Sequence, residues 1–482
     1  MKRFLLYLVA WLVAWLPLQA HVVVINDSVQ TTVEQIVATG LPLVLVETVD
    51  AVEPTCDYVS APPGAWGMSI TNATKVPGRL CIYMGDTIPA YDSGEYDGRS
   101  HGMTIKLRGN TSAYRDKKPY KIKLETSDDL LMRDDPDCYE RDWLLVTDDQ
   151  LKALSGFMLG QVLGMQWTPA FRYVNLVIND NYRGVYMLIE SIKRNPYSRI
   201  DVSRSGMLCE ADAYWWNADV YIKSRLDAHY GYTFKYPSDE GLSEADLNYF
   251  RDYLGAFEAS LSQDNYEQYI DVTSFARWCL AQDILGAWDS GGTNRYYSRY
   301  DREQDTPLVM PCLWDFDSNE MNYSNWSRCH VEHFSRLFNN PNQTFRLEYI
   351  KQWFRVLPTL RQQMKQLFTD FRYSNQYRGM YNSVLMNNHR WGTTISFMLA
   401  VSNRDKWYDN RLPILQKLID SLRLSCDVNI DGSVDVADVN TAINCMLGQN
   451  APDVIPAACD VNQDDAVDVT DVNFIINAML GR

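Results

Sequence analysis

Two segments near the C-terminus of this 482-residue chain are near copies of each other. Residues 426–438 align without a gap on residues 459–471, an offset of 33 positions. In both copies Asp or Asn occupies positions 1, 3, 5, 9 and 12 of a loop that begins one residue after the Cys. Calcium binds about six to eight oxygen ligands, and this spacing wraps oxygens around one centre. The duplicated segment therefore predicts two calcium sites.

The predicted ligands are those at loop positions 1, 3, 5, 7, 9 and 12, with position 7 contributing a backbone carbonyl. They are Asp427, Asn429, Asp431, Ser433, Asp435 and Asp438 in the first loop, and Asp460, Asn462, Asp464, Ala466, Asp468 and Asp471 in the second. Gly432 supplies the sharp turn at position 6 of the first loop. Asp465 takes that place in the second, which makes the second loop weaker, although Asp tolerates the left-handed conformation better than most residues.

Each loop continues into an apolar segment with helical spacing, Val439–Leu447 or Val472–Leu480. A full EF-hand would carry Glu at position 12 and a helix before each loop; here position 12 is Asp and no entering helix is evident. Residues 427–481 resemble the type I dockerin family, which consists of two calcium-binding loop–helix repeats. The resemblance implies a small all-α domain that docks on a cohesin-like partner through residues 425–482.

The N-terminus indicates export. Lys2 and Arg3 precede the apolar run Phe4–Leu18, and Ala20 suits a cleavage site, so residues 1–20 are expected to be a signal peptide. No later stretch reaches the roughly 18 apolar residues that a membrane span needs. The mature protein is expected to begin at His21, without a membrane span, and to be secreted, periplasmic or at the cell surface. Disulfides are permitted among the ten cysteines, with the pairing open.

A nucleic-acid partner is not expected, because the formal net charge is −16 and phosphate contacts need basic surfaces.

The body of the chain is strand-like first and helix-like later, which predicts an α+β fold. The expected order is a β-rich segment at 21–98, a main domain at 99–424 and the calcium-binding domain at 425–482. Ser425–Cys426 marks the change of composition.

Three short segments of the body suit a nucleotide: Trp288–Asn294, Trp314–Asp317 and the basic strand Lys117–Lys123. Asp289 and Asn294 stand five residues apart, and Asp315-Phe316 follows Asn294 by 21 residues after a short apolar run. Phosphoryl transfer needs a divalent metal held by a carboxylate and an amide, a second carboxylate that orients the attacking hydroxyl, and a cation on the phosphates. The spacing matches the catalytic-loop Asp, the Asn and the metal-binding Asp of protein kinases.

Several segments together resemble the CotH family of atypical secreted kinases. They are Arg108-Gly-Asn-Thr-Ser112, Lys117-Lys-Pro-Tyr-Lys-Ile-Lys-Leu124, Asp142-Trp-Leu-Leu145, Gly184-Val-Tyr-Met-Leu-Ile-Glu190 and Trp314-Asp-Phe-Asp317. The resemblance covers roughly residues 40–420. It implies a two-lobed, divergent protein-kinase-like domain that uses ATP with Mg²⁺ or Mn²⁺ and phosphorylates Ser or Thr of an acceptor protein.

By position, the resemblance makes Asp289 the catalytic carboxylate and Asn294 and Asp315 the metal ligands. Lys118, Lys121 and Lys123 are candidates for the phosphate-binding lysine. Strand alternation puts Lys121 and Lys123 on one face, and Lys121 is the preferred candidate. Arg108 is expected to add a phosphate contact. Glu190, at the end of a strand that lines the nucleotide pocket, is expected to contribute to nucleotide binding.

Two departures from kinases stand out: there is no GxGxxG loop, so residues 108–112 would have to cover the phosphates, and Asp317 replaces the Gly of the Asp-Phe-Gly motif. Two other functions stay open. One is a catalytically silent structural or binding protein on the same fold. The other is a component of polysaccharide degradation, because two distant carboxylates leave no local signature and dockerin-like tails accompany such enzymes.

Overall fold

The computed structural model describes residues 21–65, 67–287, 294–317, 320, 323, 331–449 and 454–481. The expected signal peptide and Asp289 lie outside these residues. Among the described residues, no helix is both long enough and apolar enough to span a membrane.

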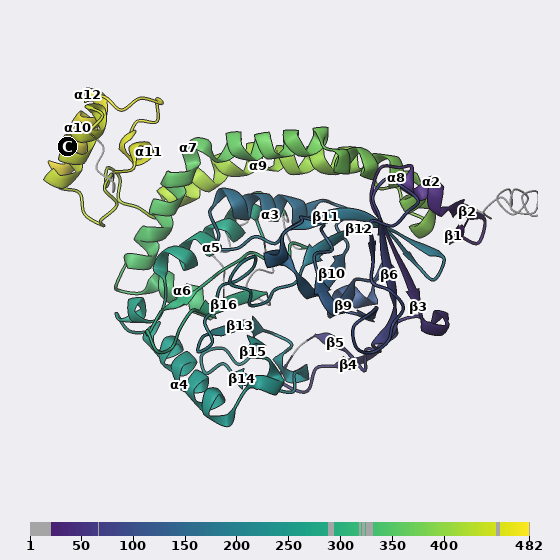
Figure 1. Ribbon diagram of the computed structural model, residues 1–482. Helices are drawn as coiled ribbons and strands as arrows, with labels where there is room; N and C mark the ends of the chain where they lie inside the picture. The colour runs from purple at the N-terminus through teal and green to yellow at the C-terminus, as the bar shows by residue number, and fades with distance from the viewer. Residues whose placement is uncertain are drawn as a thin grey trace, which may run out of the picture.

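A closed barrel forms the first half of the body (Figure 1). Seven strands pair in a ring, because β10 pairs with β12 as well as with β9. In order around the ring they are β10 (Glu140–Val146), β9 (Tyr120–Asp128), β8 (Met103–Leu107), β6 (Val76–Tyr83), β3 (Leu43–Thr48), β11 (Phe171–Ile178) and β12 (Asn181–Glu190). Alternate apolar residues such as Ile105, Ile122 and Trp143 form one buried cluster of the barrel.

Shorter strands extend this sheet: β1 (Val22–Asn26) pairs with β12, β2 (Val29–Thr32) with β1, and β7 (Tyr91–Asp92) with β6. Because β3 and β6 belong to the same ring as β8 to β12, the expected boundary at residue 98 falls inside the barrel. The α+β class is confirmed. Where the sequence predicts the first of two kinase lobes, the structure has a closed barrel.

A second sheet lies beside the barrel (Figure 1). Its strand order is β14 (Tyr221–Lys223), β15 (Gly231–Tyr236), β13 (Met207–Asp212), β16 (Arg295–Arg299) and β17 (Leu308–Val309). A separate hairpin of β4 (Asp57–Ser60) and β5 (Met68–Thr71) bridges the two sheets. Asn217 of the second-sheet region donates to the Ser69 hydroxyl at 2.9 Å, and Tyr58 donates to the Ala113 carbonyl at 3.0 Å beside the barrel.

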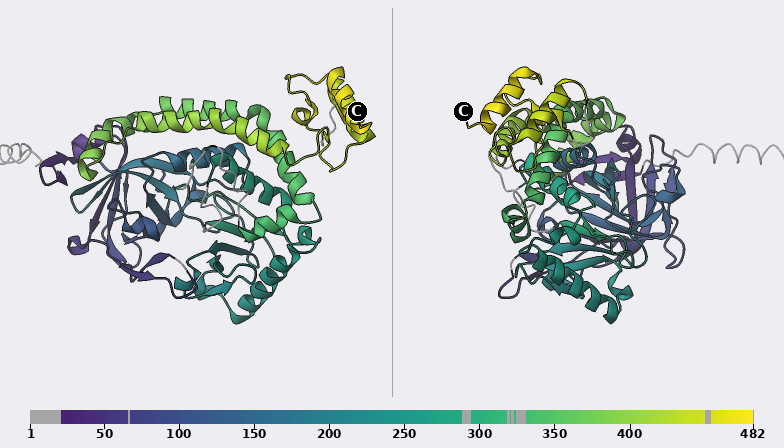
Figure 2. Two further views of the ribbon diagram at one scale, coloured as in Figure 1. Left: turned by 180° about the vertical axis from the view of Figure 1, so that it is seen from behind. Right: turned by 90° about the vertical axis from the view of Figure 1, so that its left-hand side faces the viewer.

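Helices cover both sheets and share the largest apolar core with them (Figures 1 and 2). They are α3 (Lys152–Val162), α4 (Glu244–Ser260), α5 (Val272–Leu285), α6 (Glu332–Asn339), α7 (Thr344–Tyr373), α8 (Asn375–Trp391) and α9 (Phe397–Asp420). The short helix α2 (Val33–Val37) belongs to a smaller apolar cluster with β1 and β3. The long helices α7 and α9 run side by side along one side of the body in both views. They lie in the later part of the body, which the sequence predicts to be helix-like.

The C-terminal unit packs at one end of α7 (Figure 2). Helices α10 (Val436–Met446) and α12 (Val469–Met479) pack against each other around a small apolar cluster. Both begin three residues before the predicted helices, at Asp435 and Asp468 caps. One turn of helix, α11 (Pro456–Cys459), precedes the second loop directly, where no entering helix was expected.

Candidate functional site

A cavity of about 640 Å³ lies between the outer face of the barrel and the second sheet. Strands β8 and β9, strands β13 and β15, the 108–112 turn and the segment after β17 contribute to its walls. This volume falls in the range of about 300–1,000 Å³ typical of small-molecule sites. The cavity is therefore large enough for a nucleotide.

Basic side chains from the barrel line one wall of the cavity. Lys106 on β8 stands opposite Lys121 on β9 in the strand register, and Arg108 follows β8. Burial lowers the pKa of both lysines, and their mutual repulsion adds to this effect for Lys106. This wall is therefore suited to an anion, which would relieve the repulsion.

Lys121 is held in place by Asp142 on the neighbouring strand β10. The ammonium lies 2.7 Å from the Asp142 carboxylate, which also pairs with Lys193. Burial alone would raise the pKa of Asp142, but the two lysines outweigh it and lower this pKa to about 2. Asp142 is therefore ionised at neutral pH and fixes the position of Lys121.

Acidic side chains from β13 face the basic wall. Glu210 pairs with Lys235 at 3.0 Å, and Asp212 lies two residues further along the same strand. Burial and the neighbouring Glu210 carboxylate raise the pKa of Asp212 to about 7. These two acids carry no sequence motif and were not predicted, since alternation on one strand is their only signal.

Asn294 and Asp315 meet at the same wall. The Asn294 side-chain amide donates to the Asp315 carboxylate at 2.9 Å, across 21 residues of sequence. The Asn294 backbone N–H donates to Glu210 at 3.2 Å. Both Asn294 (φ 68°) and Asp315 (φ 59°) adopt the left-handed conformation, which is uncommon outside glycine and concentrates at functional sites.

Phe316 anchors this segment beneath helix α3. Its ring is buried against Phe157, with ring centroids 5.0 Å apart in an edge-to-face arrangement. A Cβ added to Gly156 would come within 2.1 Å of the Phe316 ring, so the close approach requires glycine at that position. The packing of Phe316 thereby fixes the direction of its neighbour Asp315.

Asp317 connects the two walls of the cavity. Its carboxylate pairs with Arg115 at 2.6 Å, and its backbone carbonyl accepts from Lys152 at 2.6 Å. Asp317 occupies the position of the motif glycine of kinases, and here it forms an ion pair with the segment that follows the 108–112 turn. Asp289, the expected catalytic carboxylate, lies outside the described residues.

The 108–112 turn lines the cavity, as the sequence predicts, but it is not its sole cover. The hairpin residues Gly67, Ser69 and Ile70 also line it. The Ser69 hydroxyl donates to Asn110 at 2.6 Å, which joins hairpin and turn. The sequence analysis placed residues 57–71 in a separate β-rich segment and missed this role.

Lys118 and Lys123 are not among the residues that line the cavity. Lys118 donates to the carbonyls of Ala113 at 2.8 Å and Arg115 at 3.3 Å, and so braces the turn. Lys123 is exposed on β9. Of the three candidate lysines, only Lys121 faces the cavity.

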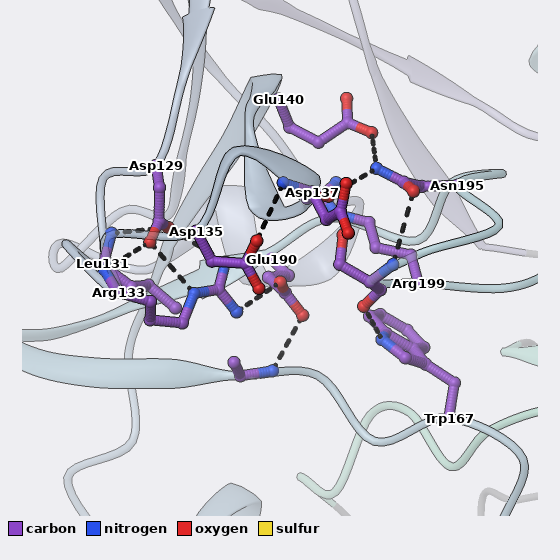
Figure 3. Close-up of polar contacts among 12 residues, drawn as sticks. Asp129, Leu131, Arg133, Asp135, Asp137, Glu140, Trp167, Glu190, Asn195 and Arg199 are labelled. Atoms are coloured by element: carbon purple, nitrogen blue, oxygen red, sulfur yellow. Dashed lines mark hydrogen bonds and ion pairs between the residues drawn. The ribbon is translucent and has the colours of Figure 1, made fainter.

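Glu190 is not among the residues that line the cavity, contrary to the expectation that it would contribute to the nucleotide pocket; its polar contacts are drawn in Figure 3. Its neighbour Ile189 is the residue that lines the wall. The buried Glu190 carboxylate pairs with Arg133 at 2.8 Å and accepts the backbone N–H of Ala170 at 2.9 Å. Side chains alternate along a strand, so one residue decides which face is lined.

The two C-terminal loops have the same internal hydrogen bonds. The position 1 carboxylate accepts N–H groups of positions 5 and 6, at 3.1 and 2.9 Å in the first loop and at 3.2 and 3.0 Å in the second. The position 12 carboxylate, Asp438 or Asp471, is fully buried and accepts the N–H of position 2 at 2.8 or 2.7 Å. The duplicated sequence therefore folds into duplicated loops.

The loop oxygens have the chemistry that calcium prefers. Among the residues that the structure describes, no group of three or more His, Cys, Asp or Glu side chains is already arranged around a metal position. Gly432 (φ 92°) and Asp465 (φ 66°) both take the left-handed conformation at position 6. The second loop thus makes the same turn with a residue that adopts it at a cost.

Comparison with protein families agrees with these two regions. The profile described as CotH kinase protein matches residues 105–385, more than half of the chain. The chain belongs to the CotH family. The profile of the dockerin type I domain matches residues 425–480, so a dockerin domain follows the CotH domain. No curated protein matches the chain.

The dockerin match has direct consequences for the C-terminal unit. Dockerin type I domains bind calcium and dock on cohesins, and proteins that carry them are typically extracellular or on the cell surface. The CotH match covers the barrel from β8 onward, the second sheet and α8 in part. It contains Lys121, Glu210, Asn294 and Asp315, four of the residues that line the cavity.

Proposed function

We propose that this protein is an exported phosphotransferase that moves the γ-phosphoryl group of ATP to Ser or Thr of an acceptor protein. The observation that carries the proposal is the charge distribution of the cavity. Lys106, Lys121 and Arg108 lie on the barrel wall, and the opposite wall carries acids and an amide, with its Lys235 paired to Glu210. Phosphoryl transfer is catalysed chiefly by positioning and by electrostatic stabilisation of the phosphates and their metal.

In this proposal the phosphates lie against Lys121, Lys106 and Arg108. Asn294 and Asp315 hold Mg²⁺ or Mn²⁺, which are hard cations that prefer oxygen ligands. The metal, when bound, neutralises charge on the phosphate oxygens. The contact of 2.9 Å, in which the Asn294 amide N–H donates to the Asp315 carboxylate, supports this pairing, because it places the two side chains next to each other in the cavity.

The transfer itself makes one bond and breaks one. The acceptor hydroxyl oxygen bonds to the γ-phosphorus, the bond from that phosphorus to the β–γ bridging oxygen breaks, and ADP leaves with the electron pair. Asp289 orients the hydroxyl and takes its proton. This is the role that the five-residue spacing from Asn294 suggests for Asp289.

The dockerin domain serves as an anchor in this proposal. The acidic and amide side chains at loop positions 1, 3, 5, 9 and 12, with the carbonyls of Ser433 and Ala466, bind two calcium ions. Calcium orders the loops, and the domain attaches the CotH domain to a cohesin-like partner outside the cell. The matching hydrogen bonds of the two loops support equivalent roles for them.

Incubation with γ-labelled ATP, Mg²⁺ or Mn²⁺ and an extracellular protein fraction tests the proposal, with Asp289→Ala and Asp315→Ala compared with the parent chain. We expect label on Ser or Thr with the parent and its loss in both variants. Label that persists in both would refute the assigned roles. Nucleotide binding without transfer to any acceptor would show instead a silent binding protein.

A further inference from the structure

A second cavity of about 540 Å³ lies next to the first and has an excess of positive charge. Its basic residues are Lys193, Arg194, Arg204, Lys235 and Arg302, against the two acids Glu140 and Asp246. Such an excess is unusual in a protein whose formal net charge is −16. Cavities lined by one sign of charge concentrate ligands of the opposite sign.

Only part of this positive charge is neutralised within the protein. Arg302 pairs with Asp246 at 2.6 Å, and Lys193 pairs with Asp142. Arg204 is exposed, and its side chain makes no hydrogen bond or ion pair with the part of the chain that the structure describes. The Arg194 guanidinium carbon lies 4.7 Å from the centroid of the Tyr236 ring, and this stacking leaves the Arg194 charge close to the cavity.

The form of the second cavity favours an extended ligand. Its basic residues come from four separate segments of the chain. Tyr236, Pro237 and Phe250 add an apolar surface, which a peptide can cover and a free phosphate cannot. Ligand clefts combine such apolar surface with a few polar anchors.

Lys235 connects the two cavities, because it lines both. Its ammonium pairs with Glu210 at 3.0 Å, and Glu210 accepts the backbone N–H of Asn294 at 3.2 Å. A peptide held in the second cavity would therefore extend toward the proposed metal ligands.

We propose that the second cavity binds an acidic peptide segment, in which Asp or Glu residues flank the Ser or Thr that enters the first cavity. The binding stands on the charge and form of the second cavity. Its role in acceptor selection rests on the phosphotransfer proposed above.

Fluorescence anisotropy with the full chain tests the binding without nucleotide. The probe is a labelled peptide in which glutamates flank a single serine, compared with the same peptide carrying glutamines. We expect the glutamate peptide to bind at least about tenfold more tightly, and Arg204→Glu to weaken it about tenfold. Arg204→Lys should retain the affinity. Lys365→Glu, which reverses an exposed charge on α7 outside both cavities, should leave it unchanged.

Equal affinity for the two peptides, or equal affinity of Arg204→Glu and the parent, would overturn the inference. So would displacement of the peptide by inorganic phosphate at matched concentration, which would reveal a simple phosphate site. A transfer assay with the same peptides separates the two proposals. Binding without transfer would count against the phosphotransferase alone, whereas transfer with no preference for the glutamate peptide would count against the acidic-peptide cavity alone.

Discussion

The C-terminal loops and the central cavity both gather oxygen ligands, but the chain brings them together in opposite ways. Each loop collects its predicted ligands within 12 consecutive positions, such as Asp427 to Asp438. The cavity takes its lining from residues between Gly67 and Asp317. A local site depends on turn geometry and is repeated when the sequence is repeated. An assembled site depends on the packing of the barrel against the second sheet. Single substitutions should therefore affect the cavity or the loops without affecting the other.

The largest expected effect comes from Asp315→Asn, which should disable the cavity alone. Loss of the metal-binding carboxylate should lower phosphotransfer on the order of 10³-fold, because the phosphate charge is no longer neutralised. The calcium response of the dockerin domain should stay the same. Labelled transfer and calcium titration of one preparation measure both. Asp370→Asn, on the surface of α7, is the control; transfer above a tenth of the parent rate in Asp315→Asn would contradict the assignment.

Lys121→Met and Lys123→Met form a matched pair on strand β9. Lys121 lines the cavity and Lys123 is exposed, although the pleat puts both on the same side of the strand. We expect Lys121→Met to lower kcat/KM for ATP about 10–100-fold, and Lys123→Met to change it little. Steady-state kinetics with varied ATP measure the difference. Equal losses in the two variants would place the phosphates elsewhere.

Gly156→Ala tests whether the packing of Phe316 fixes the cavity. The added methyl group would collide with the Phe316 ring, so we expect a loss of about 1–3 kcal/mol in the free energy of unfolding. In the same helix, the nearest atom to an added Cβ at Gly160 is the Thr168 hydroxyl at 3.1 Å, so Gly160→Ala should cost less. Urea denaturation measures both, and equal costs would mean that Phe316 does not determine the fit.

The raised pKa of Asp212 predicts a pH dependence of stability that comes from the cavity. Its carboxyl has a pKa of about 7 in the folded chain, because of burial and Glu210, against an ordinary value of 3.8. The folded state therefore holds the proton more tightly than the unfolded state. The resulting stabilisation is fully present below about pH 4 and is lost as pH rises through about 7. Asp212→Asn should reduce the fall in unfolding free energy between pH 5 and 8; an unchanged fall would exclude this carboxyl as its source.

The smallest effect is expected for calcium binding by the second C-terminal loop. Asp465 adopts the left-handed conformation that Gly432 adopts without cost in the first loop. Asp465→Gly should therefore tighten calcium binding by the second loop a few-fold, and phosphotransfer should not change. Calorimetric titration of calcium resolves the second site. Weaker binding in the variant would mean that the Asp465 side chain itself supports the loop.

The sequence predicts the local C-terminal loops better than it predicts the assembled cavity. The dockerin loops are read directly from spacing, because the hydrogen bonds that shape each loop lie within it. The helix starts and the short helix α11 were not predicted. The spacing of Asn294 and Asp315 also predicted that they would meet, and their side chains are in contact. Glu190 was expected in the pocket and lies on the other face of β12, because strand alternation cannot be assigned to a face without knowing how the sheet closes.

Glu210, Asp212 and Lys235 show what sequence reading missed. They carry no motif, and they become part of the site only because β13 and β15 pack beside the barrel. The closed barrel was missed for the same reason. Its closing contact joins β10 to β12, and such long-range pairing has no local pattern.

Calorimetric titration of ATP into the full chain, with and without Mg²⁺, tests the central claim most directly, namely that the cavity holds a nucleotide between a basic wall and a metal-binding wall. We expect one ATP site whose affinity rises with Mg²⁺ in the parent chain, with that rise lost in Asp315→Asn. ATP binding that is absent, or that is equally tight with and without Mg²⁺ in both proteins, would contradict it.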